Sequence, residues 1–359
     1  MDISLFFEPV KEELIEEFQD DSRHVINSVS INITGDVDWR SSDIVFFTVG
    51  IQNADNLRKI FYTLKQGSAS YSIVDIGHLN PGKTDEDTRE RLTEVCDTIL
   101  QEKKILIVIG SLKDFEYALY SGYYYMPRGM TFLNVDSHLD LGEYDEDSGL
   151  EKVISNEDGH LSEYIHLGHQ GYFISEEGVD LLEYLSHTSL RLGKVRSNIS
   201  ITEPLIRMSD LAYINMRSVK QVDYTANKNL HPFGLSGEEI CQLAWYAGNA
   251  DNLSILGVNT VNELDDPMSA HVIAIMMWYF IEGVYKRVDG QDFESENFTQ
   301  YKVAFDEMGT ELVFYKSIRT GKWWVRVDEK QVIPCSYEDY EVASAGDLPD
   351  RWLSSKVKS

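Results

Sequence analysis

Short runs of consecutive apolar residues alternate along this chain with longer segments that have a helical pattern. Strands that are apolar at every position are typical of parallel sheets with helices over both faces. The pattern therefore predicts an α/β fold, a sandwich of helices around a mainly parallel sheet. The apolar runs lie at residues 44–49, 72–76, 105–109, 131–135, 211–216 and 253–258, and the helical segments include 87–101, 237–246 and 270–284.

The last sixty residues have a different pattern. Residues 311–327 have the composition of a strand, a turn and a second strand, which predicts a β-hairpin. We expect an α/β domain over residues 1–300 and a C-terminal extension over residues 301–359 that packs on it. Trp323 and Trp324 are expected to pack the hairpin onto the domain rather than to form an exposed docking surface.

Composition and charge limit the classes of partner. The chain has 359 residues, of which 43% are hydrophobic, and this is enough for a large buried core. Its 32 Lys and Arg residues against 60 Asp and Glu residues give a net charge of −28. A surface this acidic repels phosphate backbones and anionic lipid headgroups. We therefore expect no nucleic-acid partner and no membrane partner.

The cysteines and the apolar segments indicate the compartment. Cys96, Cys241 and Cys335 are far apart and form no CxxC pair, so neither a zinc ribbon nor a disulfide framework is expected. The first residues are acidic and lack the basic flank and the apolar stretch of a signal peptide. The apolar segment 270–284 is shorter than a bilayer-spanning helix. These features predict a cytoplasmic protein.

A cluster of polar residues follows the apolar run 131–135. Asp136, His138 and Asp140 are spaced by two, so an extended backbone sends their side chains in the same direction. Ligands of open parallel sheets bind at the carboxyl ends of the strands, which is where this segment is expected to lie. The three side chains are candidate metal ligands, since carboxylate and imidazole groups can bind a metal. The alternative is that they only hydrogen-bond a loop.

Three histidines follow further along the chain. His160, His166 and His169 lie within GHLSEYIHLGHQGYF, which we interpret as a possible substrate loop beside the same site. Histidines scattered in this way also occur on surfaces and in packing roles, and that alternative stays open.

A second motif predicts a different function. Residues Gly77 to Thr84 (GHLNPGKT) match the P-loop pattern GxxxxGK[ST] of nucleotide hydrolases. However, Asp85, Glu86 and Asp87 follow directly and would place carboxylates where phosphates must bind. The alternative is an ordinary helix start, in which Thr84 caps the helix and Asp87 completes a capping box.

The segment NVDSHLD at residues 134–140 resembles the DAHxD motif of the ureohydrolase family, which contains arginase, agmatinase and formimidoylglutamase. FGLSGEEICQLAWYAG at 233–248 and MMWYFIEGVY at 276–285 extend the resemblance, with formimidoylglutamase-like proteins as the nearest branch. The resemblance covers most of the chain to about residue 300. It implies a three-layer α/β/α fold, a homo-oligomer, and two manganese ions that activate a hydroxide to attack a guanidinium or amidine carbon.

Several positions of the family's site carry other side chains here. The resemblance places Lys113 where the family's first motif has a histidine ligand. It places Asn215 and Arg217 at two aspartate ligands of a later motif. Thr260 falls at the position of the glutamate that orients the substrate. Only the ligands in the segment 136–140 match the family.

The replacements carry a compensating charge. Asp136 and Asp140 would be costly to bury without a counter-charge. The ammonium of Lys113 and the guanidinium of Arg217 can pair with them where the metals would lie. We therefore predict that side-chain cations have replaced the metals. No cofactor is expected on this interpretation, and manganese is expected if any metal is retained.

Three functions are compatible with these residues. The favoured one is a ureohydrolase-fold protein that is non-catalytic or altered in activity, with a small amidine or amino acid as its possible ligand. The first alternative is a manganese-dependent hydrolase of linear amidines with a mononuclear or rearranged site, because three mixed ligands can hold one metal. The second alternative is a P-loop nucleotide hydrolase.

Overall fold

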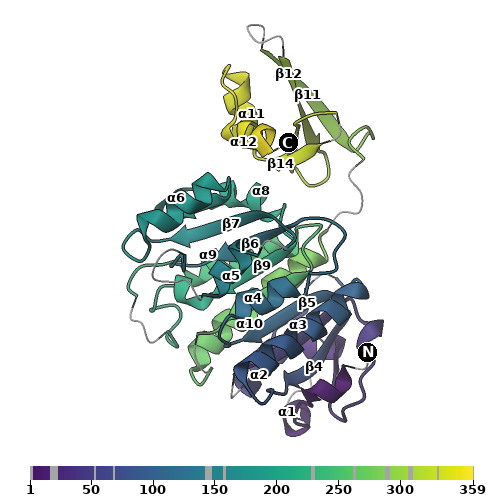
Figure 1. Cartoon of the computed structure of the whole chain (residues 1–359). Coiled ribbons are helices and arrows are strands. Elements are labelled where there is room, and N and C mark those ends of the chain that lie inside the picture. The colour runs from purple at the N-terminus through teal and green to yellow at the C-terminus, as the bar shows by residue number, and fades with distance from the viewer. Residues whose placement is uncertain are drawn as a thin grey trace.

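A ten-stranded β-sheet forms the centre of the computed structural model (Figure 1). The structure describes residues 3–16, 23–51, 54–67, 69–141, 148–156, 159–227, 231–261, 264–287, 292–305, 310–329 and 331–358. The strands of this sheet are β1 (Phe7–Glu8), β2 (Val29–Ile31), β3 (Ile44–Val49), β4 (Ile73–Leu79), β5 (Ile105–Gly110), β6 (Met130–Val135), β7 (Leu161–His169), β8 (Thr188–Arg191), β9 (Leu211–Asn215) and β10 (Ile255–Asn259).

The strand order is β1-β4-β3-β5-β10-β9-β6-β7-β8, and β2 pairs with β4 off this path. Every described pair in the sheet is parallel except β1 with β4. The six apolar runs in the sequence form β3, β4, β5, β6, β9 and β10. The prediction of a mainly parallel sheet is therefore confirmed.

Helices cover both faces of the sheet, because successive strand residues enter two different cores. In β3, Ile44 and Phe46 lie in one hydrophobic cluster, whereas Val45 and Phe47 lie in the other. This arrangement confirms the three-layer fold (Figure 1). The first cluster includes residues of α2 (Ala54–Thr63), α7 (Leu192–Ser197), α8 (Glu203–Ile206), α9 (Gly237–Gly248) and α10 (Pro267–Val284), and the second includes residues of α3 (Asp85–Gln101), α4 (Phe115–Ser121), α5 (Gly149–Ile154) and α6 (Glu176–Tyr184).

Short helical elements complete the domain. The four-residue helix α1 lies at Glu13–Glu16. The 3-10 turns are η1 (Ser4–Phe6), η2 (Val25–Ser28), η3 (Trp39–Ser41), η4 (Ile199–Thr202) and η5 (Met216–Ser218).

The helix α10 is a core helix. Among the described helices it is the one whose length and apolar composition would let it cross a membrane. It packs against α9 and α2, and 56% of its 18-residue window is buried inside the structure. A helix that is apolar around its whole circumference is expected in the core of a large domain, so the interpretation of residues 270–284 as a buried helix is confirmed.

The C-terminal residues form a second, smaller sheet (Figure 1). The expected hairpin is present as β12 and β13, but it is part of a four-stranded antiparallel sheet in the order β11-β12-β13-β14. Trp323 and Trp324 are 6% and 4% exposed, so they do not form an exposed docking surface. Their rings pack mainly on side chains of the C-terminal extension, and the guanidinium of Arg207 lies over the ring of Trp324. The elements are β11 (Phe298–Phe305), β12 (Thr310–Ser317), β13 (Trp323–Arg326), β14 (Val332–Cys335), α11 (Tyr337–Ser344) and α12 (Asp350–Lys358).

Two arginines, the buried Arg207 and the partly buried Arg351, connect this small sheet to the main domain. The Nη2 group of Arg207, which follows α8, donates hydrogen bonds to the carbonyls of Trp323 at 2.9 Å and Cys335 at 3.2 Å. The Nη2 group of Arg351 in α12 donates to the carbonyl of Pro204 in α8 at 2.8 Å. The C-terminal extension therefore packs on α8 through charge-assisted hydrogen bonds.

The structure contradicts the P-loop interpretation of Gly77 to Thr84. Residues Gly77 to Leu79 belong to β4, where Leu79 pairs with β1, so they are not free to wrap around a phosphate. The hydroxyl of Thr84 instead accepts a hydrogen bond from the amide of Asp87 at 3.1 Å, and the carboxylate of Asp87 accepts one from the amide of Thr84 at 3.1 Å. The predicted capping box at the start of α3 is confirmed.

One fully buried ion pair joins α2 to the sheet. The guanidinium of Arg58 donates to both carboxylate oxygens of Asp75 in β4, from Nε at 2.8 Å and from Nη2 at 3.1 Å, and the two side chains are 3% and 0% exposed. Nη2 also donates to the carbonyl of Gly77 at 2.8 Å, and the hydroxyl of Tyr62 donates to Asp75 at 2.7 Å. A carboxylate buried this deeply would be strongly destabilising without this cation.

We expect Arg58→Met to lower the free energy of unfolding by about 3–5 kcal/mol, because it leaves Asp75 buried without a counter-charge. The double variant Arg58→Met/Asp75→Leu should recover part of that loss. Urea unfolding measures both. The control is Arg40→Met, which breaks a pair with Glu102 in which both side chains are 47% exposed and should cost less than about 1 kcal/mol. Equal losses in Arg40→Met and Arg58→Met would contradict the prediction.

Candidate functional site

Four neighbouring strands end at the same edge of the sheet. In the pairing register Asn259 at the end of β10 lies between Gly110 at the end of β5 and Asn215 at the end of β9. Val135 at the end of β6 pairs with Ile214 of β9. The polar segments that follow these strands therefore meet, as expected for the carboxyl edge of a parallel sheet.

A small cavity of about 230 Å³ lies at this edge. It is lined by the ends of β6, β9 and β10, by the segments that follow β5, β6 and β9, and by the starts of α4 and α5. Six residues singled out from the sequence line it, namely Lys113, Asp136, His138, Asp140, Asn215 and Arg217. Residues that the sequence did not single out as site residues also line it, among them Asp114, Glu116, Asn134, Tyr213 and Asn259.

Arg217 is bonded to both aspartates of the cavity. Its Nε and Nη2 groups donate to the two carboxylate oxygens of Asp136 at 2.7 and 2.8 Å, which is a bidentate pair. Nη2 also donates to the carboxylate of Asp140. Burial alone would lower the pKa of Arg217, but the charges of the two aspartates raise it above its ordinary value. The guanidinium is therefore a permanent cation that joins the two carboxylates.

Local hydrogen bonds hold Arg217 in this position. The side-chain oxygen of Asn215 accepts from the backbone amide of Arg217 at 3.2 Å, so Asn215 caps the 3-10 turn η5. The hydroxyl of Ser137 donates to the carbonyl of Arg217 at 3.3 Å. Because Ser137 adjoins Asp136, the segment after β6 contacts the segment after β9 in two ways. The Ser137 hydroxyl bonds the backbone of Arg217, and the Asp136 carboxylate bonds its side chain.

Lys113 lies in the wall of the same cavity and is exposed to solvent. Arg217 makes ion pairs with Asp136 and Asp140. The pairing predicted for Lys113 remains a prediction. The neighbouring Asp114 accepts from Arg89 of α3 and from Lys152 of α5, both at 2.8 Å.

Thr260 does not line the cavity. It is fully buried, and its backbone amide donates to the carbonyl of Gly110 at 2.8 Å, which ties the end of β10 to β5. Asn259, one residue earlier, lines the cavity instead. Neighbouring residues of an extended chain point to opposite sides, so Asn259 lines the cavity while Thr260 is buried.

His138 packs against aromatic rings in the wall of the cavity. Its ring is stacked on Phe173 at a centroid distance of 4.5 Å and lies 5.7 Å from the ring of His231. Its Nδ1 lies 2.8 Å from the hydroxyl of Ser137. Burial, followed by the charge of Arg217, lowers the pKa of His138, so the neutral ring is favoured near pH 7.

The three later histidines do not form a substrate loop. His166 and His169 are buried residues of strand β7, and none of the three lines the 230 Å³ cavity. His160 precedes the strand, at its opposite end, beside Tyr124. The segment 161–169 forms a strand because its alternate positions enter the two cores, with Ile165 in one and Tyr164 in the other.

His166 forms hydrogen bonds with the backbone of Asp136 and with the hydroxyl of Tyr164. Its Nδ1 lies 2.9 Å from the hydroxyl of Tyr164, and its Nε2 lies 3.2 Å from the carbonyl oxygen of Asp136. A carbonyl can only accept, so Nε2 carries the proton and the hydroxyl donates to Nδ1. The side-chain amide of Asn134 donates to that hydroxyl at 2.9 Å. Burial lowers the pKa of His166 to about 3 and that of His169 to about 4, so both rings are neutral at pH 7.

Glu116 in α4 is an acidic member of the cavity that sequence reasoning missed. Its carboxyl group is hydrogen-bonded to the hydroxyl of Tyr213, which accepts from the side-chain amide of Asn259 at 2.8 Å. Burial raises the pKa of Glu116 to about 7, and the negative charges of Asp140 and Asp136 act in the same direction. Its position in the first turn of the helix after β5 is a signal that could have identified it.

Possible ligand atoms at this edge of the sheet are bonded to other side chains. Two divalent cations need several carboxylates and imidazoles whose lone pairs are free. Here both oxygens of Asp136 are bonded to Arg217, and the ring of His138 is stacked on Phe173. Within the described ranges, no group of three or more His, Cys, Asp or Glu side chains is placed to hold a metal. The assignment of Asp136, His138 and Asp140 as metal ligands remains a prediction.

Glu116→Gln should change how stability depends on pH. Between the ordinary pKa of 4.5 and the raised value of about 7, the folded protein keeps a proton that the unfolded chain has lost. The wild type therefore loses stability as pH rises through this window, and the variant lacks this loss. From pH 5 to pH 8 the stability of the variant relative to wild type should rise by on the order of 2 kcal/mol.

Urea unfolding at both pH values measures the difference for Glu116→Gln. The control is Glu176→Gln at the exposed start of α6, whose stability relative to wild type should not change between pH 5 and pH 8. An unchanged difference for Glu116→Gln would show that the pKa of this carboxyl is ordinary in the folded protein.

Solved structures with a similar fold include a formiminoglutamase, a formimidoylglutamase and an agmatine ureohydrolase. Formiminoglutamase from Trypanosoma cruzi, in oxidized form at pH 4.6, superposes with a TM-score of 0.66 at 17% identity, over 75% of this chain and all of that chain. Formimidoylglutamase from Bacillus subtilis superposes with a TM-score of 0.63 at 13% identity, over 75% of this chain and 94% of that chain. The agmatine ureohydrolase of Thermoplasma volcanium superposes with a TM-score of 0.58 at 16% identity, over 77% of this chain and 99% of that chain. These similarities show the fold.

The sequence itself also matches a family. A comparison with curated proteins finds no match. The model of the Arginase family matches residues 49–236, which is more than half of the chain. That range runs from the end of β3 to the residue before α9 and includes the segments that follow β5, β6 and β9. The chain therefore belongs to the arginase family.

Proposed function

We propose that this protein is a member of the arginase family that does not hydrolyse amidines with a metal pair. In this proposal the guanidinium of Arg217 takes the place of the metal charge. The observation that supports it most directly is the bidentate contact of Arg217 with Asp136 and its further contact with Asp140. A metal ion at these carboxylates would have to displace a cation that two charges and three hydrogen bonds hold.

The cost of a buried charge explains why the arrangement would persist. The side chain of Asp136 is 3% exposed and that of Arg217 is 19% exposed. A carboxylate at this depth without a partner is strongly destabilising, whereas a hydrogen-bonded pair approximately compensates for its own desolvation. Loss of the metals therefore demands a positive side chain at this point, and an arginine meets the demand because its planar fork matches a carboxylate.

We further propose that the cavity binds a small amino acid or amidine without cleaving it. The cavity of about 230 Å³ has room for a ligand of a few non-hydrogen atoms. Its wall presents carboxyl groups at Glu116 and Asp140, an ammonium at Lys113 and a side-chain amide at Asn259. Groups of both signs around a small polar space suit a ligand that itself carries both charges or a delocalised amidinium.

Metal content and turnover test this proposal. Purified protein incubated with MnCl2 and then desalted should retain far less than one manganese per chain. It should release no urea from arginine or agmatine and no formamide from formimidoylglutamate. Any of the three compounds that occupies the cavity should raise the melting temperature, because a ligand that binds the folded state stabilises it.

A gain-of-metal variant provides the matched comparison. Lys113→His/Asn215→Asp/Arg217→Asp restores the side-chain types that the family resemblance assigns to these positions, and it should bind manganese. The same triple variant with Asp136→Asn added is the control and should not. Two manganese ions per wild-type chain, together with urea or formamide release, would overturn the proposal. One manganese per wild-type chain with turnover would instead establish the mononuclear hydrolase.

Arg217→Met tests the role of the cation directly. We expect a loss of about 3–5 kcal/mol in the free energy of unfolding, because Asp136 would remain buried and unpaired. Arg217→Met/Asp136→Leu should recover part of this loss, as measured by urea unfolding at pH 7. Arg196→Met removes an exposed arginine from its pair with Glu239 and should cost less than about 1 kcal/mol. A loss as small as this for Arg217→Met would mean that the pair is not needed.

Two further expectations belong to this proposal. The cytoplasm is the proposed location because the cysteines Cys96, Cys241 and Cys335 are free and buried, which suits a reducing compartment. A homo-oligomer is proposed from the family resemblance, and light scattering would measure the number of chains. A small amidine or amino acid remains the proposed partner, with neither nucleic acid nor membrane.

A further inference from the structure

Strand β11 forms one edge of the small C-terminal sheet (Figure 1). In the order β11-β12-β13-β14 its described neighbour is β12, and the two strands pair in an unbroken antiparallel register. The register runs from Phe298 opposite Ser317 to Phe305 opposite Thr310. The other side of an edge strand carries a row of backbone N–H and C=O groups that can pair with another strand.

Hydrogen bonds at the start of the hairpin show which residues of β11 carry this outer row. The amide of Ser317 donates to the carbonyl of Lys322 at 2.9 Å, so the backbone groups of Ser317 point toward the β13 side. Its partner Phe298 therefore has its own backbone groups on the outer side of β11. The amide of Ile318 donates to the carbonyl of Asn297 at 2.9 Å, as this phase requires.

The outer row continues along the strand. Backbone direction alternates from residue to residue, so Gln300, Lys302 and Ala304 also have their N–H and C=O groups on the outer side. All three residues are exposed. The amide of Phe298 is bonded to the carbonyl of Ser295 at 3.1 Å, so the row begins with the carbonyl of Phe298. Within the described ranges, no backbone group pairs with this row.

The edge at β11 lacks most of the features that protect edge strands. Shortness, proline and bulges commonly prevent an edge strand from pairing with another chain. The opposite edge strand, β14, has four residues and contains Pro334. In contrast, β11 has eight residues, contains no proline, and pairs with β12 without a register shift. Its one charged residue is Lys302, which opposes pairing unless a carboxylate lies opposite it.

The outer row of β11 is complementary to itself. Two identical antiparallel strands are related by a twofold axis. A register centred on Tyr301 places Gln300 opposite Lys302 of the second copy, where the two residues exchange two backbone hydrogen bonds. It also places Ala304 opposite Phe298 of the second copy. A register centred on Lys302 would instead bring two lysines together. The register centred on Tyr301 therefore uses the whole row and separates the lysines.

The same register brings opposite charges together. The side-chain amide of Gln300 donates to the carboxylate of Glu294 at 3.2 Å, and the side chain of Glu294 is 72% exposed. Opposite residues of a sheet project from the same face, so Lys302 of the second copy reaches this carboxylate. The side chain of Lys302 is 60% exposed in its own chain. Residues 297–305 contain no Asp or Glu, which reduces repulsion at this edge in a chain of net charge −28.

We propose that two copies of this chain associate through β11, so that their small sheets become one continuous antiparallel sheet. Backbone hydrogen bonds would supply the pairing, and two symmetric contacts between Lys302 and Glu294 would fix the register. The interface lies outside residues 49–236, which the Arginase family model matches. The proposal therefore does not depend on the resemblance to that family.

A disulfide tests the register in the full chain. Tyr301 would lie opposite Tyr301 of the second copy in a non-hydrogen-bonded pair, where Cα atoms are about 4.5 Å apart and a disulfide can form. Tyr301→Cys should therefore give a covalent dimer on mild oxidation, as seen on a non-reducing gel. The control is Thr299→Cys, which would lie more than about 13 Å from its own copy and should give none. The native cysteines are buried.

Sedimentation velocity on the full chain tests the association itself. Wild-type particles should contain an even number of chains, and Gln300→Pro should halve that number. Proline removes an outward N–H and leaves the bonds to β12 in place. Lys302→Glu should raise the dissociation constant at least about tenfold, because it places two carboxylates opposite each other. Lys302→Glu/Glu294→Lys should recover most of the loss.

Lys11→Glu is the matched control for the charge change. It alters a lysine that is 65% exposed and paired with Asp55, far from β11 in the chain, and it should leave the dissociation constant unchanged. Circular dichroism checks the fold of each variant. A monomeric wild-type chain would overturn the proposal, as would an unchanged number of chains in Gln300→Pro. Equal disulfide yields in Tyr301→Cys and Thr299→Cys would also overturn it.

Discussion

Asp136 is a carboxylate buried at the edge of a parallel sheet, and its requirement for a positive charge organises the cavity around it. In the family that the sequence resembles, metal ions meet such a requirement. In this chain the guanidinium of Arg217 lies on both oxygens of Asp136 and reaches Asp140 as well. A carboxylate removed from water must be paired, and a hydrogen-bonded arginine can hold two carboxylates at once. The side chains nearby serve the same pair. Asn215 and Ser137 form hydrogen bonds with the backbone of Arg217. His166 donates a hydrogen bond to the carbonyl of Asp136.

The sheet makes this arrangement possible because it aligns the ends of β5, β10, β9 and β6. Each strand carries a polar residue or segment just past its last buried position, and the parallel register brings these positions to one edge. The same fold that places metal ligands in other proteins can thus place an ion pair. The family-model match over residues 49–236 shows that the chain belongs to the arginase family. The chemistry at the edge depends on which side chains occupy the four strand ends.

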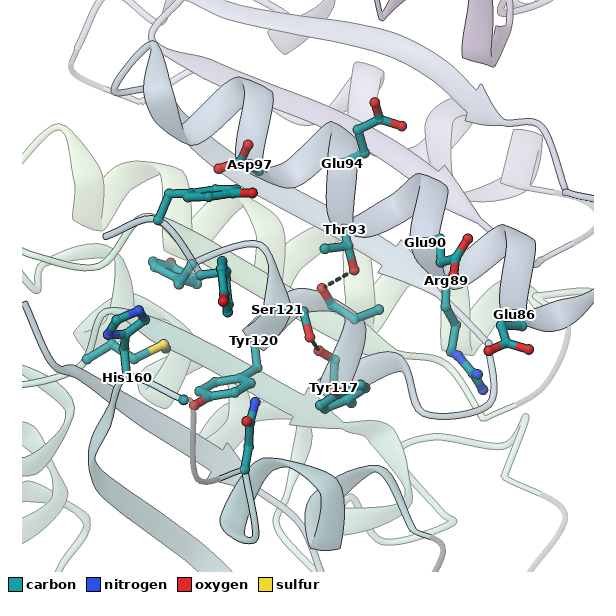
Figure 2. Close-up of a pocket in the computed structure, with 17 residues that line it drawn as sticks. Glu86, Arg89, Glu90, Thr93, Glu94, Asp97, Tyr117, Tyr120, Ser121 and His160 are labelled. Atoms are coloured by element: carbon teal, nitrogen blue, oxygen red, sulfur yellow. Dashed lines mark hydrogen bonds between the residues drawn. The ribbon is translucent and has the colours of Figure 1, made fainter. Parts of the chain in front are cut away.

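A larger cavity of about 810 Å³ between α3 and α4 has a different physical character from the cavity at the sheet edge (Figure 2). At the edge, positive and negative side chains are paired and largely buried. In the larger cavity, the glutamates of α3 are exposed to solvent, and the tyrosines of α4 and the following turn line the opposite side. Arg89 connects the two places, since it lines the larger cavity but bonds Asp114 of the smaller one.

The sequence alone determined the alternation of strands and helices, the parallel sheet and the capping box at Thr84, because these follow from local periodicity and short-range hydrogen bonds. It also placed Asp136, Asp140 and Arg217 at one site through the family resemblance. The tertiary structure decided that Asn259 at the end of β10, and not Thr260, lines the cavity, since neighbouring residues point in opposite directions. It also decided that residues 161–169 form a buried strand rather than a loop, that Glu116 joins the site, and that acidic and aromatic residues face each other between α3 and α4. Contacts between elements distant in the chain set these outcomes, and a pattern along one segment does not contain them.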